Sequence, residues 1–309
     1  MHVAGTKGKG TTCAYTNSIL QHYQDTVGLP RKIGLYTSPH LVAVRERIRI
    51  NSKPISEEMF AKYFFQVWHT LEGVSLEPKP SYFRFMTLLS FHVFMQEGVD
   101  AAIYETGVGG EMDSTNIIEK PLATAITTLG IDHVKTLGDT VDLIAWHKAG
   151  ILKNGSPSFT TDQVTEAMAI LQKRATEKGV ALTKVIPSEA LGKVAISPAE
   201  DFQKQNASLA VELATVVLNK HGIPVNRSKD MLPTQFVDGL EGLVWRGRCE
   251  TKTTGKLHWH LDGAHNEASL KVACSWFGRS SRSSFVSIGS PFSGTCPHLT
   301  VITGIARKF

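Results

Sequence analysis

The chain has 309 residues, of which 42% are hydrophobic and 20% charged, and its formal net charge is +5 at pH 7. This length allows two domains with separate cores, and this composition argues against a disordered chain. The positive charge is mild and spread along the chain, which favours small anionic partners and argues against nucleic acid. No apolar run could span a bilayer, so stable membrane insertion is not expected. The four scattered cysteines form no C-x-x-C pair, which indicates reduced thiols in the cytoplasm or the mitochondrial matrix.

The first predicted element is a phosphate-binding loop, followed by a helix over residues 12–23. Glycines allow backbone N–H groups to approach an anion, a lysine adds a point charge for the outer phosphates, and a following hydroxyl can bind Mg²⁺. A simple P-loop NTPase is not favoured, because an extra glycine separates the lysine from the threonine. The residues expected to bind nucleotide phosphates are Gly8, Lys9, Gly10 and Thr11.

Short apolar runs then alternate with amphipathic stretches along the chain. Strands that alternate with helices are typical of a doubly wound, mostly parallel sheet of the α/β class. A composition break near residue 247 divides this part from a second segment that begins with a fresh strand. The predicted strands are 32–36, 100–105, 124–129 and 257–261, and the further predicted helices are 85–95 and 140–153.

Three polar residues are expected just beyond the carboxyl ends of these strands, where open α/β sheets bind ligands. Glu105 directly follows an apolar run, which is the usual place for a Mg²⁺ ligand near a nucleotide. Each residue also has a plainer interpretation: Ser38 as a turn residue, Glu105 as a solvated charge and His133 as a loop histidine. Because all three residues share this position, a metal site competes with these plainer interpretations.

Lys148 shares a predicted helix face with Ile144 and Ile151. Burying a charged amine on an apolar face is costly, so its pKa should fall, and a neutral amine can take up carbon dioxide as a carbamate. The alternative is that Lys148 extends to solvent from the edge of the helix.

The second segment contains an Asp-Gly turn between a strand and a helix, with Asp262 and His265 in it. This placement fits a binding turn, and the alternative is a plain turn. Arg248, near the start of the segment, could reach an anion or could simply lie on a loop.

Together these stretches resemble the folylpolyglutamate synthases, members of the Mur ligase family, in family order over residues 2 to about 277. The residue types at two positions, Lys7 and Arg84, are similar to those of the eukaryotic members. The matching motifs are HVAGTKGKGT at 2–11, YTSPHL at 36–41, RERIRIN at 45–51, ETGVGG at 105–110, DSTN at 113–116, HKAGI at 147–151 and DGAHN at 262–266.

The resemblance implies an α/β fold with a Mur ligase-like ATP- and folate-binding domain over 1–247 and the start of a Rossmann-like glutamate-ligase domain over 248–309. Folate would lie near residues 37–47 with Tyr82 and Phe83. The implied catalytic residues are Lys9, Lys148 as a carbamate, and His265 beside L-glutamate. The implied ATP-binding residues are Gly8, Lys9, Gly10, Thr11, Arg248 and Asp262. The implied Mg²⁺ ligands are Ser38, Glu105 and His133, with a monovalent cation as a further candidate.

The implied reaction is an ATP-dependent carbon–nitrogen ligation. The terminal γ-carboxylate of a reduced folate attacks the γ-phosphate of ATP, giving an acyl phosphate and ADP. The amine of L-glutamate then attacks the acyl phosphate, which releases phosphate and forms an amide. Reduced folate, ATP and L-glutamate are therefore the expected partners of a monomeric enzyme.

The family pattern extends past both ends of this sequence. Family members have a full strand before the phosphate loop and a full domain after residue 266, whereas the likeness here fades near Trp276 and Phe277. We therefore expect a chain truncated at both ends. Two alternatives stay open: a dihydrofolate synthase that adds glutamate to dihydropteroate, and a truncated, non-catalytic remnant that binds nucleotide or folate.

Overall fold

The computed structural model describes residues 1–74, 79–255, 257–264 and 267–286. The chain divides into two compact units, Met1–Leu243 and Val244–Phe309. The second unit thus begins at Val244, whereas the sequence analysis placed the start of the second domain at 248. The two units are described separately below.

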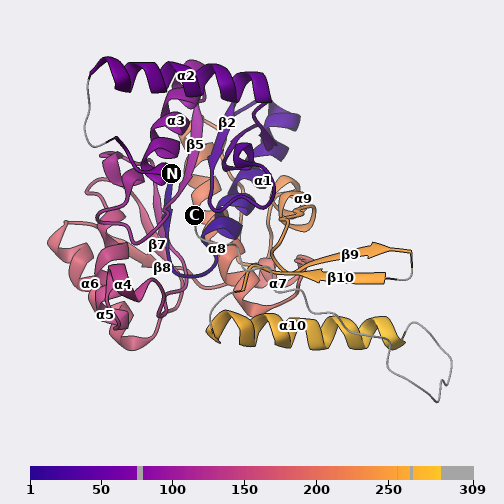
Figure 1. Ribbon diagram of the computed structural model, residues 1–309. Helices are drawn as coiled ribbons and strands as arrows, with labels where there is room; N and C mark the ends of the chain where they lie inside the picture. Colours follow the sequence, from indigo (N-terminus) through magenta and orange to yellow (C-terminus); the bar gives the residue numbers. More distant parts are fainter. Residues whose placement is uncertain (75–78, 256, 265–266, 287–309) are drawn as a thin grey trace. The chain divides into compact units, whose positions relative to one another are not determined.

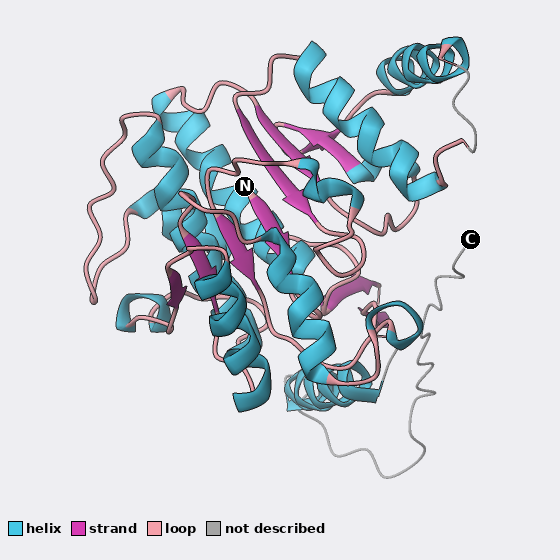
Figure 2. Ribbon diagram, turned by 90° about the vertical axis from the view of Figure 1, so that its left-hand side faces the viewer, coloured by secondary structure: helices cyan, strands magenta, loops and turns pink. Residues whose placement is uncertain are grey.

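The first unit is built on a central sheet with helices packed on it (Figure 2). The sheet has eight strands in the order β4-β3-β2-β5-β1-β6-β7-β8. The six strands from β2 to β8 in this order are parallel, and β3 and β4 are antiparallel additions at one edge. The predicted α/β class with a mostly parallel sheet is therefore confirmed. The strands are β1 His2–Ala4, β2 Ile33–Tyr36, β3 Ile48–Ile50, β4 Lys53–Pro54, β5 Ala101–Glu105, β6 Thr124–Ile126, β7 Ser158–Thr160 and β8 Leu182–Lys184.

One face of this sheet is covered by three helices, α1 (Lys9–Val27), α8 (Asp201–Lys220) and α9 (Thr234–Glu241). Helix α1 packs against β1, β2 and β5 and also against α8 and α9, while α8 reaches β6 and β7 (Figure 1). Packing against several elements explains why α1 begins at Lys9, earlier than the predicted residue 12, despite a glycine in its first turn.

The opposite face carries two apolar clusters, because alternate residues of each strand point to opposite sides of the sheet. Tyr36 and Tyr104 pack with α2 and α3 in one cluster, and Ala4 and Ile126 pack with α5 and α6 in the other. The helices on this face are α2 Glu57–Gly73, α3 Tyr82–Gln96, α5 Val141–Lys148 and α6 Thr165–Glu177.

The predicted helix over 140–153 is shorter than expected. Helix α5 ends at Lys148 and continues as one 3-10 turn, η3 (Ala149–Ile151). The main chain of Glu111 approaches this turn closely, since Glu111 N donates to His147 O at 2.7 Å. The remaining short elements of the unit are η1 Val44–Arg47, η2 Ser114–Ile117, α4 Val134–Leu137 and α7 Glu189–Gly192.

We expect Gly150→Ala to destabilise the first unit by about 1–3 kcal/mol, because overpacking against main chain cannot be relieved by a side-chain rotation. A Cβ on Gly150 would lie 2.3 Å from Glu111 Cα and 2.4 Å from Glu111 N. Gly192→Ala is the matched control, since nothing lies within 4 Å of its Cβ position. Urea unfolding of both variants measures the difference, and equal midpoints would contradict the expectation.

The second unit contains an antiparallel pair of strands, β9 (Glu250–Thr254) and β10 (Leu257–Leu261), and the helix α10 (Glu267–Val286). The predicted strand at 257–261 is present. Across the described ranges of both units, no helix combines the length and apolar character needed to cross a membrane.

Candidate active site

The phosphate loop connects the central strand β1 to the first turn of α1. Gly8 is the N-cap residue of α1 and has a φ of 86°, in the left-handed region that favours glycine. A Cβ on Gly8 would lie 2.1 Å from Asn206 Oδ1, so α8 closes the space behind the loop. Lys9 and Gly10 lie in the first helical turn, and the Thr11 side chain is buried. The loop therefore presents the N-terminus of α1, where backbone N–H groups favour anions.

Thr6 ties this loop to the end of the neighbouring strand β6. Its hydroxyl donates to Gly130 O at 3.0 Å and accepts from Gly130 N at 3.1 Å. The backbone N–H groups of Thr6 and Lys7 both donate to Thr128 O. These bonds fix the loop before any ligand binds.

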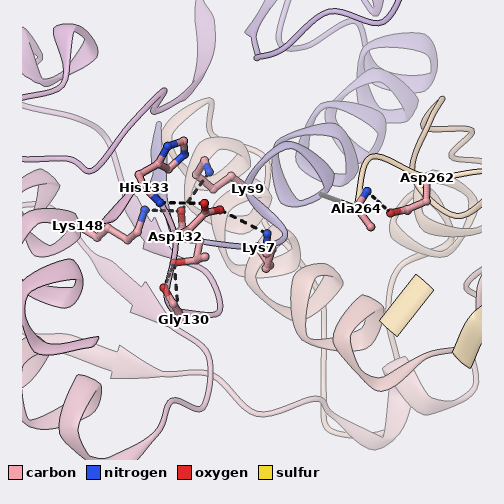
Figure 3. A network of polar contacts seen from close by, with 10 residues as sticks. Lys7, Lys9, Gly130, Asp132, His133, Lys148, Asp262 and Ala264 are labelled. Carbon is pink, nitrogen blue, oxygen red and sulfur yellow. Dashed lines mark hydrogen bonds and ion pairs between the residues drawn. The ribbon is translucent and has the colours of Figure 1, made fainter. Parts of the chain in front are cut away.

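Two lysine amines share one main-chain oxygen of the loop. Lys9 Nζ donates to Gly5 O at 3.1 Å, and Lys148 Nζ donates to the same oxygen at 2.7 Å (Figure 3). Lys148 is only 2% exposed, so the solvent-exposed alternative for this residue is wrong. Burial, followed by the nearby Lys9 charge, holds the pKa of Lys148 well below its usual value. Lys148 thus places a buried amine, with a lowered pKa, beside the phosphate loop.

Asp132 links a further lysine to the predicted histidine ligand. Lys7 Nζ lies 3.4 Å from Asp132 Oδ2, and Asp132 Oδ1 accepts from His133 N at 2.9 Å (Figure 3). His133 is the N-cap of the short helix α4 and has a φ of 51°, an uncommon value for a residue other than glycine. Asp132 therefore connects the segment after β6 to the phosphate loop.

Glu105 ends β5 and is buried, with 4% exposure, so its interpretation as a solvated charge is wrong. Its Oε2 accepts a hydrogen bond from Ser38 N at 2.9 Å, which brings two of the three predicted metal ligands together. Strand β5 lies between β2 and β1 in the sheet, so Glu105 lies between the segment of Ser38 and the phosphate loop.

A magnesium ion fits this donor set, because it prefers carboxylate and hydroxyl oxygens and Glu105 and Ser38 supply both. A buried carboxylate is also stabilised by a cation. A histidine nitrogen is a less usual magnesium ligand, so His133 fits less well. In the described residues no three or more His, Cys, Asp or Glu side chains are grouped to hold a metal. The three-residue set, which includes a serine, stays a prediction.

Asp113 holds the glycine-rich turn that follows β5. Its Oδ2 accepts from Gly107 N and Val108 N, each at 2.9 Å, and its Oδ1 accepts from Thr115 N and Thr115 Oγ1. The Thr115 hydroxyl in turn lies 2.7 Å from Nε2 of His2, whose pKa burial lowers to about 3. The turn beside Glu105 is therefore fixed by a buried network of hydrogen bonds.

The expected folate region contains an aromatic cluster at the end of β2. The rings of Tyr36 and Phe83 lie 6.2 Å apart, and Tyr82 is 52% exposed at the start of α3. The structure therefore places an exposed tyrosine beside a largely buried aromatic cluster, and the assignment of folate to this region stays a prediction.

In the second unit, the carboxylate of Asp262 accepts hydrogen bonds from backbone N–H groups around its own turn. Its Oδ2 accepts from Cys249 N and its Oδ1 from Ala264 N, both at 2.8 Å (Figure 3). Arg248 Nη1 donates to Gly247 O at 3.1 Å. These contacts support the plain-turn interpretation without testing nucleotide binding. His265 lies outside the described residues.

Sequence reasoning missed Asn206, Asp132 and Asp113 as parts of this site. Asp132 and Asp113 stand in stretches already singled out, so their position beside His133 and the glycine turn was a usable signal. Asn206 carried no local signal, since α8 brings it behind Gly8 from far along the chain.

Comparison with known proteins identifies the relatives of this chain. It is 57% identical over 284 residues to a folylpolyglutamate synthase of Neurospora crassa, covering 90% of this chain and 54% of the relative. It is 50% identical over 292 residues to the folylpolyglutamate synthase of Saccharomyces cerevisiae, covering 90% and 53%. A solved structure, an FPGS–AMPPCP–folate complex, matches with a TM-score of 0.77 and 28% identity, covering 90% of this chain and 70% of that one.

No protein-family model matches the chain. The chain spans about half the length of the curated relatives it matches. Over nine-tenths of its length, this chain is therefore similar to folylpolyglutamate synthases.

Proposed function

We propose that this chain carries the ATP- and folate-binding part of a ligase that adds L-glutamate to the γ-carboxylate of tetrahydrofolate. The observation that carries the proposal is the arrangement at the carboxyl ends of the central strands β1 and β5. Lys148 is buried and contacts the phosphate loop after β1, and Glu105 is buried at the end of the neighbouring β5. The similarity to proteins named folylpolyglutamate synthase supports it.

In this proposal the loop from Gly8 to Thr11 orients the phosphates of ATP, with Lys9 on the outer ones. Glu105 and Ser38, together with His133, would hold Mg²⁺, which when bound neutralises phosphate charge. Arg248 and Asp262 would contact ATP, and His265 would contact L-glutamate. These residues would contribute to catalysis mainly by positioning the substrates and by stabilising the charge on the phosphates.

Lys148 has a separate role in the proposal. A neutral, buried amine can attack carbon dioxide, lose one proton and become a carbamate, which places an anion where a buried ammonium would be costly. The lowered pKa of Lys148 supports this step, because only the unprotonated amine is a nucleophile. A monomer in the cytoplasm or mitochondrial matrix completes the proposal, and the free thiols of Cys13, Cys249 and Cys274 agree with a reducing compartment.

The test is glutamate incorporation. Purified chain is incubated with tetrahydrofolate, Mg-ATP and L-glutamate, and the folate products are identified by mass spectrometry, with dihydropteroate replacing tetrahydrofolate in a parallel reaction. We expect tetrahydrofolate to be extended, with one ADP released per amide formed. Extension of dihydropteroate alone would assign dihydrofolate synthase. No extension of either, with ATP or folate still bound, would assign a non-catalytic remnant.

A further inference from the structure

Arg47 is a buried arginine whose charge is not compensated by an acid. The residue ends η1, its exposed fraction is 8%, and its carbonyl accepts a hydrogen bond from Thr37 N at 3.1 Å. Within the ranges that the structure describes, no ion pair involves Arg47. An unpaired buried charge is costly, so a guanidinium in this state indicates a site for an anion.

The side-chain partner of Arg47 is a neutral group. Arg47 Nε donates to His40 Nδ1 at 2.9 Å. Arginine has no acceptor, so Nδ1 must carry a lone pair and the His40 ring in this hydrogen bond is uncharged. His40 therefore orients the guanidinium plane without neutralising it. Both Nη groups remain available for a ligand, and they are the atoms that form paired hydrogen bonds to a carboxylate.

The nearest acid in the sequence, Glu46, is engaged elsewhere. Its two carboxylate oxygens accept hydrogen bonds from the backbone N–H groups of Leu41, Val42 and Ala43, at 2.8–3.0 Å. Glu46 therefore shapes the loop over residues 41–43. Tyr82 lies on another side of Arg47, with its ring centroid 5.4 Å from the guanidinium carbon. An aromatic face favours the cation and supplies no formal negative charge.

The position of Arg47 in the sheet suggests which anion it binds. Tyr36 pairs with Ile48 across β2 and β3, so Arg47 stands opposite Thr37, next to Ser38. The order β3-β2-β5-β1 places Glu105 between this point and the phosphate loop. Neighbouring strands are about 4.8 Å apart, so roughly 10–15 Å separate the main chain near Arg47 from the loop. The long arginine side chain and a small dicarboxylate can span that separation.

We propose that Arg47, oriented by His40, binds the α-carboxylate of the terminal glutamate of the folate substrate. This inference rests on the proposed function, in which the γ-carboxylate of the same glutamate reacts at the phosphate of ATP. Both carboxylates could attack a phosphate, and the proposed product is the γ-amide. A cation on the α-carboxylate would keep that group away from ATP and direct the γ-carboxylate to the phosphate. In the proposed function the phosphates of ATP bind at the loop, so the anion assigned to Arg47 is a carboxylate.

The decisive ligands are tetrahydrofolate and its α-carboxamide, which removes one charge at nearly constant shape. Their dissociation constants are measured on the whole chain without ATP, so that the result does not depend on turnover. We expect the wild-type chain to prefer the carboxylate by about ten- to a hundredfold. Arg47→Met should bind both ligands equally, and Arg47→Lys should restore only part of the preference because it lacks the planar fork.

Arg49→Met is the matched control. Arg49 lies in β3, and its guanidinium donates to the carbonyls of Glu46 and Ser52. This variant removes the same charge and should keep the carboxylate preference. Thermal unfolding of Arg47→Met should stay within a few degrees of wild type, because no ion pair is lost.

Several outcomes would overturn the assignment. An Arg47→Met variant that keeps the carboxylate preference would show that the carboxylate binds elsewhere. In glutamate-incorporation assays of Arg47→Met, a rise in KM for L-glutamate with an unchanged KM for tetrahydrofolate would indicate that Arg47 binds the incoming L-glutamate instead. Wild-type binding of both folates without preference would overturn this subsite alone. Failure of wild type to bind either folate would overturn the proposed function with it.

Discussion

Lys148→Met is expected to lower the turnover of glutamate addition by at least about 10²–10³-fold, the usual effect of removing a preorganised polar group at a reacting centre. Methionine has nearly the same length and apolar stem, so the packing of α5 should be kept. The amine that donates to Gly5 O at 2.7 Å is lost, and with it the carbamate of the proposal. Lys153→Met is the control, since Lys153 is only half-buried and lies after η3. Equal activity of the two variants would refute a catalytic role for Lys148.

The same variant should change how stability depends on pH. Burial lowers the pKa of Lys148 in the folded protein, whereas the unfolded chain keeps the ordinary value near 10.5. Between these two values the unfolded state binds more protons, so wild-type stability rises with pH in this window. A methionine side chain cannot titrate, so Lys148→Met should be the more stable protein at pH 7, with an advantage that shrinks as the pH approaches 10.5. Urea unfolding at several pH values measures it, and a constant difference would contradict the burial of a neutral amine.

Glu105→Gln is expected to lower turnover by a similar factor, about 10²–10³-fold, and to raise the magnesium concentration needed for half-maximal activity. The amide keeps an oxygen that can accept from Ser38 N but loses the charge that attracts a divalent cation. The free energy of unfolding should change little, because shape and one hydrogen bond are retained. Activity titrated with Mg²⁺ at fixed ATP is the measurement.

Glu97→Gln provides the comparison for that variant. Glu97 precedes the amino end of β5, away from Glu105, and its carboxylate is bound to Lys32 and Tyr63. Its neutralisation should leave the magnesium dependence unchanged. If Glu105→Gln also retained the wild-type magnesium response, Glu105 would not be a metal ligand and its burial would have a structural cause.

The sequence predicted those parts of the site whose chemistry is local. Glu105 follows an apolar run, and Lys148 is spaced from Ile144 and Ile151 so that all three share one helix face. Both residues could therefore be found from the sequence, and both are buried at the expected strand and helix ends. The start of α1 was placed too late, because a glycine in the first turn disfavours a helix unless packing against α8 and α9 offsets that preference.

Other features depended on contacts between distant segments. Asn206 reaches the back of Gly8 only because α8 crosses α1, and Lys7 meets Asp132 only because β1 and β6 are neighbours. The uncompensated charge of Arg47 also has no signature in the RERIR stretch, where Glu46 stands beside it. Its isolation follows from the way Glu46 folds back onto the loop over 41–43.

The carbonyl oxygen of Gly5 has two lone pairs, and the amines of Lys9 and Lys148 occupy both. A phosphate that takes the Lys9 amine would leave this oxygen to Lys148 alone. By reciprocity, any change that weakens the hydrogen bond from Lys9 Nζ to Gly5 O would also favour phosphate binding. In the proposed function, nucleotide occupancy and the environment of Lys148 are therefore linked through this single oxygen atom.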